Sequence, residues 1–389
     1  MVQRLIYFDN AATSWPKPKV VQRAMVRFME GVGANPGRSG HRLSLAAARV
    51  VYRAREEIAE LVGCEDPLRV VFCANGTTAL NFALHGLLRP GDHVVCTSME
   101  HNSVMRPLRT LEQRGVELTV VPCSPTGELQ LFELEQTLTA RTRLIVATHA
   151  SNVVGTLLSV EGLAEVARRR KVLLLVDAAQ SAGALPIDLR RAPVDLLAFT
   201  GHKALFGPTG TGGLVIGPQV PVDEFGALIQ GGTGSRSEEE VQPEFLPDKF
   251  ESGTVNVVGL AGLAAGVHWV RSRTVEAIRE QEMALTARLL EGLREIPGVV
   301  VYGTQDVAQR LPVVLFNIEG CDPGVVGERL DREFGIMCRT GLHCAPSAHR
   351  TIGTFPHGGV RFSLSALCTQ RQVDAALRAV RQLAKERGR

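Results

Sequence analysis

The chain has 389 residues, of which 45% are hydrophobic and 21% charged, and its 43 basic and 40 acidic residues leave a net charge of +3. This composition is typical of a globular protein and argues against disorder. The near balance of charge gives no electrostatic reason to expect nucleic-acid or membrane binding, and no stretch approaches the roughly 20 apolar residues of a membrane span. We therefore predict no nucleic-acid partner and no membrane partner.

The start of the chain and the cysteines predict a cytoplasmic protein. MVQRLIYFDN, the first ten residues, lacks the apolar core of a signal peptide. Eight cysteines are scattered along the chain without paired short spacings. This distribution indicates reduced thiols and not a disulfide framework.

Short β-branched runs alternate with helix-period segments between residues 69 and 217. Several runs are apolar throughout, as strands covered on both faces must be. They are RVVFC, DHVVCTS, ELTVVPC, RLIVATH, KVLLLVD, DLLAFTG and GGLVIG. Helical patterns at 78–87 and 161–170 separate some of these runs, so we expect a mostly parallel seven-stranded sheet. GGLVIG follows its neighbour after only a short glycine-rich turn and should be the one antiparallel strand.

A second, smaller unit follows the sheet. Residues 259–296 are helix-rich and end at PG. After them come strand-like VVVYG, PVVLFNI, GIMCR and VRFSLS, with helical patterns at GVVGERLDREF and 370–386. We expect an α/β fold with a large domain of residues 15–255 and a small α+β domain formed by 1–14 and 256–389.

The segment CANGTTALNFAL, residues 73–84, joins a strand to a helix. Backbone N–H groups at a helix N-terminus bind phosphate, and threonine hydroxyls add further donors. Gly76, Thr77 and Thr78 are therefore candidates for anion binding. Taken alone, the same sequence is better explained as an ordinary helix N-cap.

Two later strands each end in a residue that could react with or bind a cofactor. LLLVDAAQSAGA places Asp177 at the end of a buried strand, where it could cap a helix or pair with a pyridinium nitrogen. TGHKALFGPTG places Lys203 at the end of the next strand, where a lysine of lowered pKa can form a Schiff base. This combination predicts a pyridoxal phosphate site, with Thr78, Thr200 and His202 holding the phosphate.

Over nearly its whole length the chain resembles class V aminotransferases of fold type I, and within them cysteine desulfurases, particularly the SUF-system type. The motifs that carry the resemblance are YFDNAATS, NGTTALN, MEHNSVMRPL, ASNVVGT, VDAAQSAG, TGHKALFGPTG, FESGTVN and RTGLHCA. The resemblance implies pyridoxal 5'-phosphate as cofactor and L-cysteine as substrate. It also implies a homodimer and a sulfur-acceptor protein, for example in iron–sulfur cluster assembly.

The resemblance implies roles for the residues around the cofactor. Lys203 matches the lysine that holds the cofactor covalently and moves the substrate Cα proton. His101 matches the histidine that stacks on the ring. Asp177 matches the partner of the ring nitrogen, and Gln180 matches the donor to the ring hydroxyl. Thr254 matches a phosphate contact that the second subunit supplies.

Three further residues match groups that act on the substrate. Asn152 and Arg361 match the groups that bind the α-carboxylate, a role that suits a bidentate arginine. Without the family, Arg361 would be expected in a surface ion pair. Cys344 matches the nucleophile that takes the sulfur as a persulfide. Arg339, also predicted to bind substrate, would stabilise this thiolate together with His343.

The segment CRTGLHCAPSAHRTIGTFPHGG leaves some alternatives open. Cys344 lies there between a short strand and a polar loop, an unusual place for a packing cysteine, although an incidental exposed thiol is an alternative. A metal site with Cys338, His343 and His349 lacks a closed four-ligand spacing, so we predict no metal. Leu342 replaces a histidine of the family motif, and NPGRSGHR also departs from the SUF-type pattern. Selenocysteine lyase, another class V enzyme and a non-catalytic cofactor-binding partner in sulfur or iron–sulfur assembly remain alternatives.

Overall fold

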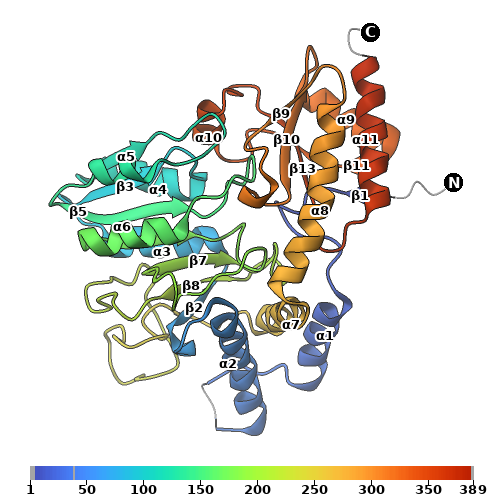
Figure 1. Cartoon of the computed structure of the whole chain (residues 1–389). Helices are drawn as coiled ribbons and strands as arrows, with labels where there is room; N and C mark the ends of the chain where they lie inside the picture. The colour runs from blue at the N-terminus through green and yellow to red at the C-terminus, as the bar shows by residue number, and fades with distance from the viewer. Residues whose placement is uncertain (1–4, 38–39, 387–389) are drawn as a thin grey trace.

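A seven-stranded sheet forms the centre of the larger part of the molecule in the computed structural model, which describes residues 5–37 and 40–386 (Figure 1). Its strands are β2 (Val70–Cys73), β3 (His93–Thr97), β4 (Glu117–Val121), β5 (Thr142–Thr148), β6 (Leu173–Asp177), β7 (Leu196–Thr200) and β8 (Gly212–Ile216). They lie in the order β2-β8-β7-β6-β5-β3-β4. Only β8 runs antiparallel to its neighbours, β2 and β7, so the predicted mostly parallel sheet with one antiparallel strand is confirmed.

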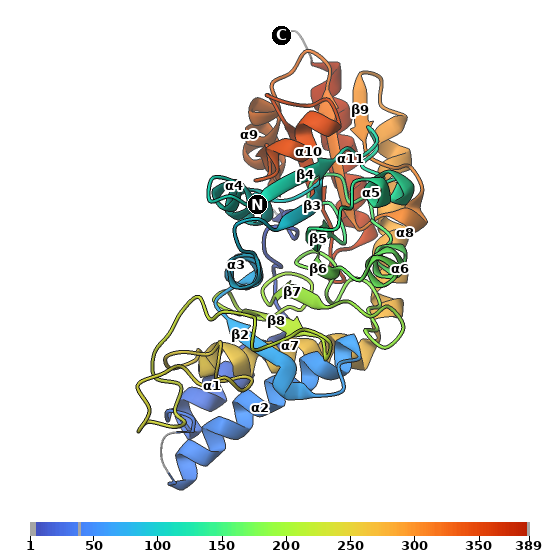
Figure 2. The same cartoon turned by 90° about the vertical axis from the view of Figure 1, so that its left-hand side faces the viewer.

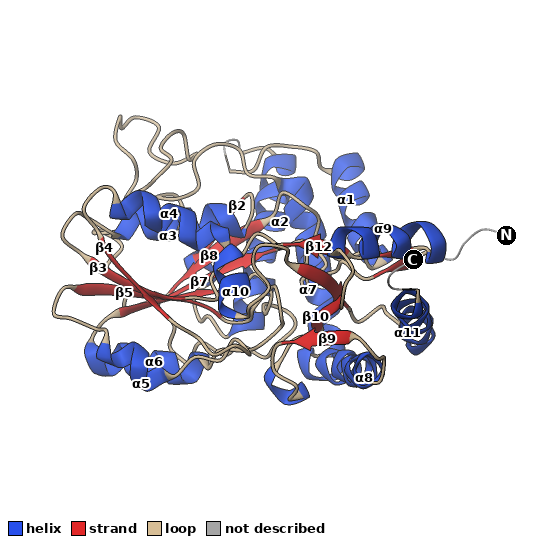
Figure 3. Ribbon diagram, turned by 90° about the horizontal axis from the view of Figure 1, so that it is seen from above, coloured by secondary structure: helices blue, strands red, loops and turns tan. Residues whose placement is uncertain are grey.

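Helices cover both faces of this sheet, which explains why several of its strands are apolar throughout. The helices are α2 (Arg42–Val62), α3 (Gly76–Leu87), α4 (Asn102–Glu112), α5 (Leu131–Gln136), α6 (Val160–Arg170) and α7 (Val257–Arg273). Figure 3 shows α3 and α4 on one face and α5 and α6 on the other. On β3, Val94 packs with α3 and α4, while Val95 packs in the core of the opposite face. This alternation follows the two-residue period of a strand.

The second unit contains a four-stranded antiparallel sheet and a two-stranded parallel sheet. Its strands are β1 (Ile6–Tyr7), β9 (Val299–Tyr302), β10 (Val313–Ile318), β11 (Ile336–Met337), β12 (Arg339–Gly341) and β13 (Gly359–Ser363). Its helices are α8 (Val275–Arg294), α9 (Pro323–Phe334), α10 (Pro346–Thr351) and α11 (Gln370–Lys385). The larger sheet has the order β12-β13-β10-β9, and its core includes Phe316, Leu330 and Phe362. The expected polar loop after Cys344 is corrected, because residues 346–351 form α10.

The first described residues of the chain join this second unit. β1 pairs in parallel with β11, and Asp9 bridges to Ser363. α1 (Lys19–Gly31), which was not predicted, packs with α7, and α7 also packs with α2. These helices lie at the opposite end of the molecule from α9 and α11 (Figure 2). The predicted domain boundaries stay a prediction, and residues 1–4, 38–39 and 387–389 of the predicted ranges and motifs lie outside the described residues.

Two short 3₁₀ helices complete the secondary structure, at Pro67–Arg69 before β2 and at Val307–Gln309 before β10. None of the helices within residues 5–37 and 40–386 combines the length and the apolar character that crossing a bilayer requires.

Candidate active site

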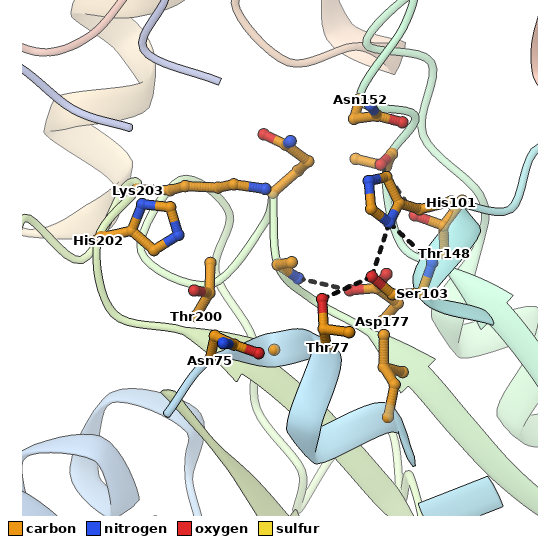
Figure 4. Close-up of a pocket in the computed structure, with 15 residues that line it drawn as sticks. Asn75, Thr77, His101, Ser103, Thr148, Asn152, Asp177, Thr200, His202 and Lys203 are labelled. Atoms are coloured by element: carbon orange, nitrogen blue, oxygen red, sulfur yellow. Dashed lines mark hydrogen bonds between the residues drawn. The ribbon is translucent and has the colours of Figure 1, made fainter. Parts of the chain in front are cut away.

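A cavity lies at the carboxyl ends of β5, β6 and β7, where parallel sheets place ligands (Figure 4). Its lining residues are Asn75, Gly76, Thr77, Leu80, His101, Ser103, Thr148, Ala150, Asn152, Asp177, Ala179, Gln180, Thr200, His202 and Lys203. Thr148, Asp177 and Thr200 are the last residues of their strands. The structure thus brings most of the predicted cofactor residues to one place.

Lys203 carries an amine suited to nucleophilic chemistry. It follows β7 and lines the cavity on the side opposite His101 in Figure 4. Burial lowers the pKa of Lys203 to about 8, although the negative charge of Asp177 opposes this effect. A buried lysine with a lowered pKa carries a substantial fraction of neutral, nucleophilic amine near neutral pH.

Asp177 places a buried carboxyl on the floor of the cavity. Its Oδ1 accepts a hydrogen bond from the Ala179 backbone N–H at 2.9 Å. Burial raises the pKa of Asp177, while this hydrogen bond and Lys203 lower it. Residues 178–184 form turns and a bridge, so Asp177 does not cap a helix. A buried carboxyl without a helix to cap remains available to a cationic group in the cavity.

The helix N-terminus and two unpaired side-chain atoms form a site for an anion. α3 begins at Gly76, and the first N–H groups of a helix have no acceptor within it. Thr200 Oγ1 and His202 Nδ1 are buried and have no hydrogen-bond partner among the described residues. Because buried polar atoms are nearly always paired, these atoms indicate a missing polar group. A phosphate group fits both the unpaired side chains and the helix N-terminus.

Thr78 does not line this cavity, unlike its neighbour Thr77. Its backbone N–H and its hydroxyl both bond Asn75 Oδ1, at 2.9 and 3.1 Å. Thr78 lines a second cavity together with Thr254, which is exposed in the single chain. The structure therefore separates these two threonines from Lys203.

His101 is held as a neutral imidazole at the start of α4. Its Nδ1 accepts a hydrogen bond from the Ser103 backbone N–H at 3.0 Å. Burial lowers the pKa of His101 to about 4, and the charges of Lys203 and Arg339 act in the same direction. Beside it, the Glu100 carboxyl is fully buried, and burial raises its pKa to about 8.

Arg361 and Asn152 contact each other at the boundary between the two units. Arg361 is only 2% exposed, which excludes the surface ion pair considered from the sequence. Its guanidinium donates to the Asn152 carbonyl and to Asp9 Oδ1, both at 2.8 Å. Gln180, another predicted residue, lines the Lys203 cavity and donates to the Ala11 carbonyl at 3.1 Å.

Cys344 is exposed and lies close to the cavity without lining it. Its carbonyl accepts from the Asn102 backbone N–H at 2.9 Å, directly after His101. Asn152 Nδ2 donates to the preceding carbonyl, that of His343, at 2.7 Å. Arg339, on β12, is exposed and pairs in register with Arg361. The backbone around Cys344 is thus attached to Asn152, which lines the cavity, and to Asn102, which lies between the lining residues His101 and Ser103.

His343 and His349 contact each other beside Cys344. Their rings stack with centroids 5.3 Å apart, and His343 Nδ1 lies 3.1 Å from His349 Nε2. Across the part of the chain that the structure describes, no group of three or more histidine, cysteine, aspartate or glutamate side chains is placed to hold a metal ion.

Several residues of the site were not identified from the sequence. Asn75, Ser103 and Thr148 line the cavity, and Glu100 is buried behind it. Lys17 donates to the His202 carbonyl at 3.1 Å. Asn75 directly precedes Gly-Thr-Thr and could have been identified as the N-cap of α3. Thr148 ends β5 as Asp177 ends β6, so its position could have been identified in the same way. The others depend on contacts between distant segments.

Comparison with known proteins gives one consistent family. The family model for class-V aminotransferases matches residues 6–376. A probable cysteine desulfurase from Methanothermobacter thermautotrophicus is 35% identical over 95% of this chain and 92% of its own. Another from Pyrococcus abyssi is 34% identical over 99% of this chain and 96% of its own. One from Mycolicibacterium paratuberculosis is longer, and this chain spans 56% of its length at 35% identity.

Solved structures give the same result. A cysteine desulfurase from Thermococcus onnurineus, solved in its apo form, superposes with a TM-score of 0.91 at 34% identity, covering 98% of this chain and 95% of that one. The cysteine desulfurase CsdA from Escherichia coli superposes with a TM-score of 0.87 at 27% identity, with the same two coverages.

Proposed function

This chain belongs to the class V aminotransferase family, and we propose that it is a pyridoxal phosphate-dependent cysteine desulfurase of fold type I. It converts L-cysteine to L-alanine and captures the sulfur as a persulfide on Cys344. One observation carries this proposal. The backbone of the exposed Cys344 is bonded to Asn102, directly after His101, and His101 shares a cavity with Lys203 and Asp177.

The cavity residues suit pyridoxal phosphate. Lys203 would hold the cofactor covalently through its amine, and Asp177 would hold a proton on the ring nitrogen. Thr200, His202 and the first N–H groups of α3, at Gly76 and Thr77, would bind the phosphate. His101 would lie against the ring, and Gln180 would donate to the ring hydroxyl. When bound there, the cofactor supplies an electron sink for the substrate Cα.

Arg361 and Asn152 would bind the substrate carboxylate: Asn152 lines the cavity, and Arg361 donates to its carbonyl. Arg361 Nε is buried without a partner in the described chain, which leaves a guanidinium N–H for a substrate carboxylate. Arg339, exposed on β12 and paired in register with Arg361, adds positive charge near that residue. Lys203, in its neutral form, removes the Cα proton.

Sulfur transfer follows at Cys344. Its thiolate attacks the sulfur of the substrate, so that an S–S bond forms and the Cβ–S bond breaks. The electron pair of the broken bond stays on Cβ, which takes up a proton and becomes the methyl group of alanine. The persulfide on the exposed Cys344 then passes to an acceptor protein, with iron–sulfur cluster assembly as one destination.

We also propose a homodimer in which Thr254 reaches the cofactor phosphate of the other subunit. Its exposure and its separation from Lys203 support this arrangement. Large apolar side chains exposed on α2 and near Thr254, such as Tyr52 and Ile229, are suited to an interface. The eight free cysteines support a cytoplasmic location. The large domain would span residues 15–255, and the remainder would form the small domain.

Turnover of L-cysteine by Cys344→Ser tests the proposed function. Alanine and persulfide are measured for the purified wild type and for this variant. We expect the variant to retain the cofactor spectrum and to lose persulfide formation, because no thiolate remains to receive the sulfur. Cys64→Ser, which changes a partly exposed cysteine, is the control and should behave as wild type. Undiminished cysteine turnover in Cys344→Ser would contradict the desulfurase mechanism, and preferential alanine release from selenocysteine would indicate a selenocysteine lyase.

A further inference from the structure

Three polar side chains form a hydrogen-bonded series from the first turn of α3 to His101 (Figure 4). Thr77 Oγ1 lies 2.7 Å from Ser103 Oγ. Ser103 Oγ lies 2.9 Å from His101 Nδ1. Ser103 is 8% exposed, and all three side chains line the Lys203 cavity. Dashed lines in Figure 4 mark both contacts.

The direction of these hydrogen bonds follows from one backbone group. The Ser103 backbone N–H can only donate, and it points at His101 Nδ1 from 3.0 Å. Nδ1 is therefore an acceptor and carries no hydrogen. The Ser103 hydroxyl, which contacts the same nitrogen, must then donate to it, so its oxygen is free to accept from the Thr77 hydroxyl. A neutral imidazole has a single N–H, which is left on Nε2.

The surroundings of His101 agree with a neutral ring. A second proton on Nδ1 would have to displace both Ser103 donors. Burial and the charges of Lys203, Arg339, Arg106 and Arg361 all lower the pKa of His101. These cations come from four different elements or loops around the ring. The ring therefore stays neutral around pH 7.

We propose that Ser103 is a positioning residue, which together with Thr77 holds His101 with its hydrogen on Nε2. The ring then offers the cavity a hydrogen-bond donor in place of a lone pair. His101 cannot take a proton from the substrate through Nε2, and this leaves Lys203 as the base. The inference rests on the proposed function in giving His101 a role beside the bound cofactor.

The Thr77 hydroxyl does not have the anion-binding role that its position at the start of α3 suggests. Its hydroxyl hydrogen is directed at Ser103, so the hydroxyl does not donate to an anion at the helix N-terminus. Its backbone N–H remains available there, because it lies in the first turn of α3. Thr77 therefore connects the anion site, through its backbone, to His101, through its side chain.

Nitrogen NMR of the full chain with ring-¹⁵N-labelled histidine tests the tautomer without any substrate. His101→Gln identifies the two resonances of this ring. In the wild type we expect a protonated Nε2 and an unprotonated, hydrogen-bonded Nδ1 between about pH 6 and 8. Ser103→Ala should move the Nδ1 resonance toward that of a free neutral imidazole, and Ser103→Thr should restore it. A hydrogen on Nδ1, or no change in Ser103→Ala, would overturn the proposal.

Thr110→Ala is the matched control. It removes a hydroxyl from the same helix, α4, where Thr110 donates to the Arg106 carbonyl at 3.1 Å on the exposed side. We expect this variant to leave both His101 resonances unchanged. A shift as large as that of Ser103→Ala would show that the resonances report helix stability only, and would overturn the positioning role.

Kinetics and cofactor binding give a second, independent readout. Ser103→Ala should lower kcat for L-cysteine about 3- to 10-fold, the equivalent of one hydrogen bond, with little change in KM.

Thr77→Val keeps the backbone N–H and should leave cofactor affinity within about twofold of wild type. A loss of about tenfold or more would mean that the Thr77 hydroxyl binds the phosphate, which contradicts the proposed direction. If L-cysteine is not turned over at all, the proposed function fails while the NMR result still decides the tautomer.

Discussion

Lys203 shows how burial prepares a single residue for its reaction. The amine lies inside the cavity, where the nearby charges of Asp177 and Cys344 favour its protonated form. Desolvation disfavours the ammonium form and outweighs these attractions, so the pKa falls to about 8. A lysine on the protein surface would stay protonated at this pH.

The rate at which the cofactor-free chain takes up pyridoxal phosphate should follow this pKa. Only the neutral amine attacks the aldehyde, and the amine is protonated below its pKa. We expect the rate to rise with pH up to about 8 and to level off above it. Stopped-flow absorbance over a pH series measures this, with Lys203→Ala as the control that forms no covalent link. A rate that keeps rising to about pH 10, as for an exposed lysine, would contradict the prediction.

Site residues at the ends of strands could be predicted from the sequence. Site residues whose position depends on contacts between distant segments could not. Asp177, Thr200 and Lys203 follow buried apolar runs, so their arrival at one edge follows from the parallel sheet. The position of Ser103 depends on how the start of α4 meets the first turn of α3. No local pattern in the sequence contains that contact. For the same reason, the sequence did not distinguish Thr77 from Thr78.

The connection between β12 and α10 is the element that positions Cys344. His343 and Cys344 both have left-handed backbone conformations, with φ of 50° and 57°. Such conformations are unfavourable for residues other than glycine and need support from their surroundings. The Arg339 carbonyl can only accept, so His343 Nε2 carries the hydrogen and its Nδ1 accepts from His349. His349 in turn accepts from the Thr354 hydroxyl at 2.6 Å.

His349→Phe should displace this connection while keeping a ring in the core. Phenylalanine cannot donate to His343 Nδ1, which would remain buried without its partner. We expect single-turnover persulfide formation to fall about tenfold, with cofactor affinity unchanged, because the cofactor residues lie on other elements. Rapid-quench measurement of the Cys344 persulfide tests this. Ser347→Ala, on the same helix, is the control, and equal rates in the two variants would contradict the role of His349.

Long apolar elements were predictable, whereas short or polar ones were not. Most strands of the large sheet are buried on both faces, which makes several of their sequences apolar throughout, whereas the edge strand β4 is partly exposed. β12 and α10 contain few apolar residues and are held by contacts with the other unit, such as that between Asn152 and His343. The amphipathic helix α2 has a clear helical period. It was nevertheless not predicted, because it precedes the alternating pattern of strands and helices from which the sheet was predicted.

At the scale of the whole molecule, the residues proposed to bind one cofactor lie in two separate cavities. Thr254 follows Glu251, whose carboxylate pairs with Arg55 on α2 and accepts from the Phe72 backbone N–H at 2.6 Å. This buried ion pair fixes the segment before Thr254 to the edge of the sheet. Thr254 itself faces a cavity that Lys203 does not line. A second subunit would give this exposed threonine a partner.

Thr254→Ala should weaken cofactor binding without separating the subunits. A hydrogen bond to a charged group contributes about 1.5–3 kcal/mol, so we expect a loss of about tenfold or more in affinity. Equilibrium dialysis measures the affinity, and sedimentation measures the mass, which should be twice that of the chain for both proteins. Thr233→Ala, whose hydroxyl contacts Ser235 in the same segment, is the control. A monomer with full cofactor affinity would contradict the shared site.

The exposure of Cys344 also determines how the protein can be damaged. Of the eight cysteines, all within the described residues, the other seven are at least partly buried. Burial raises the pKa of several of them, including Cys73, Cys123 and Cys338, and so protects them from oxidants. Oxidative stress would therefore act first at Cys344, where the sulfenic state is reversible and the higher oxidation states are lasting. A bound persulfide would occupy that thiol, so a steady supply of substrate would also influence how long the protein survives.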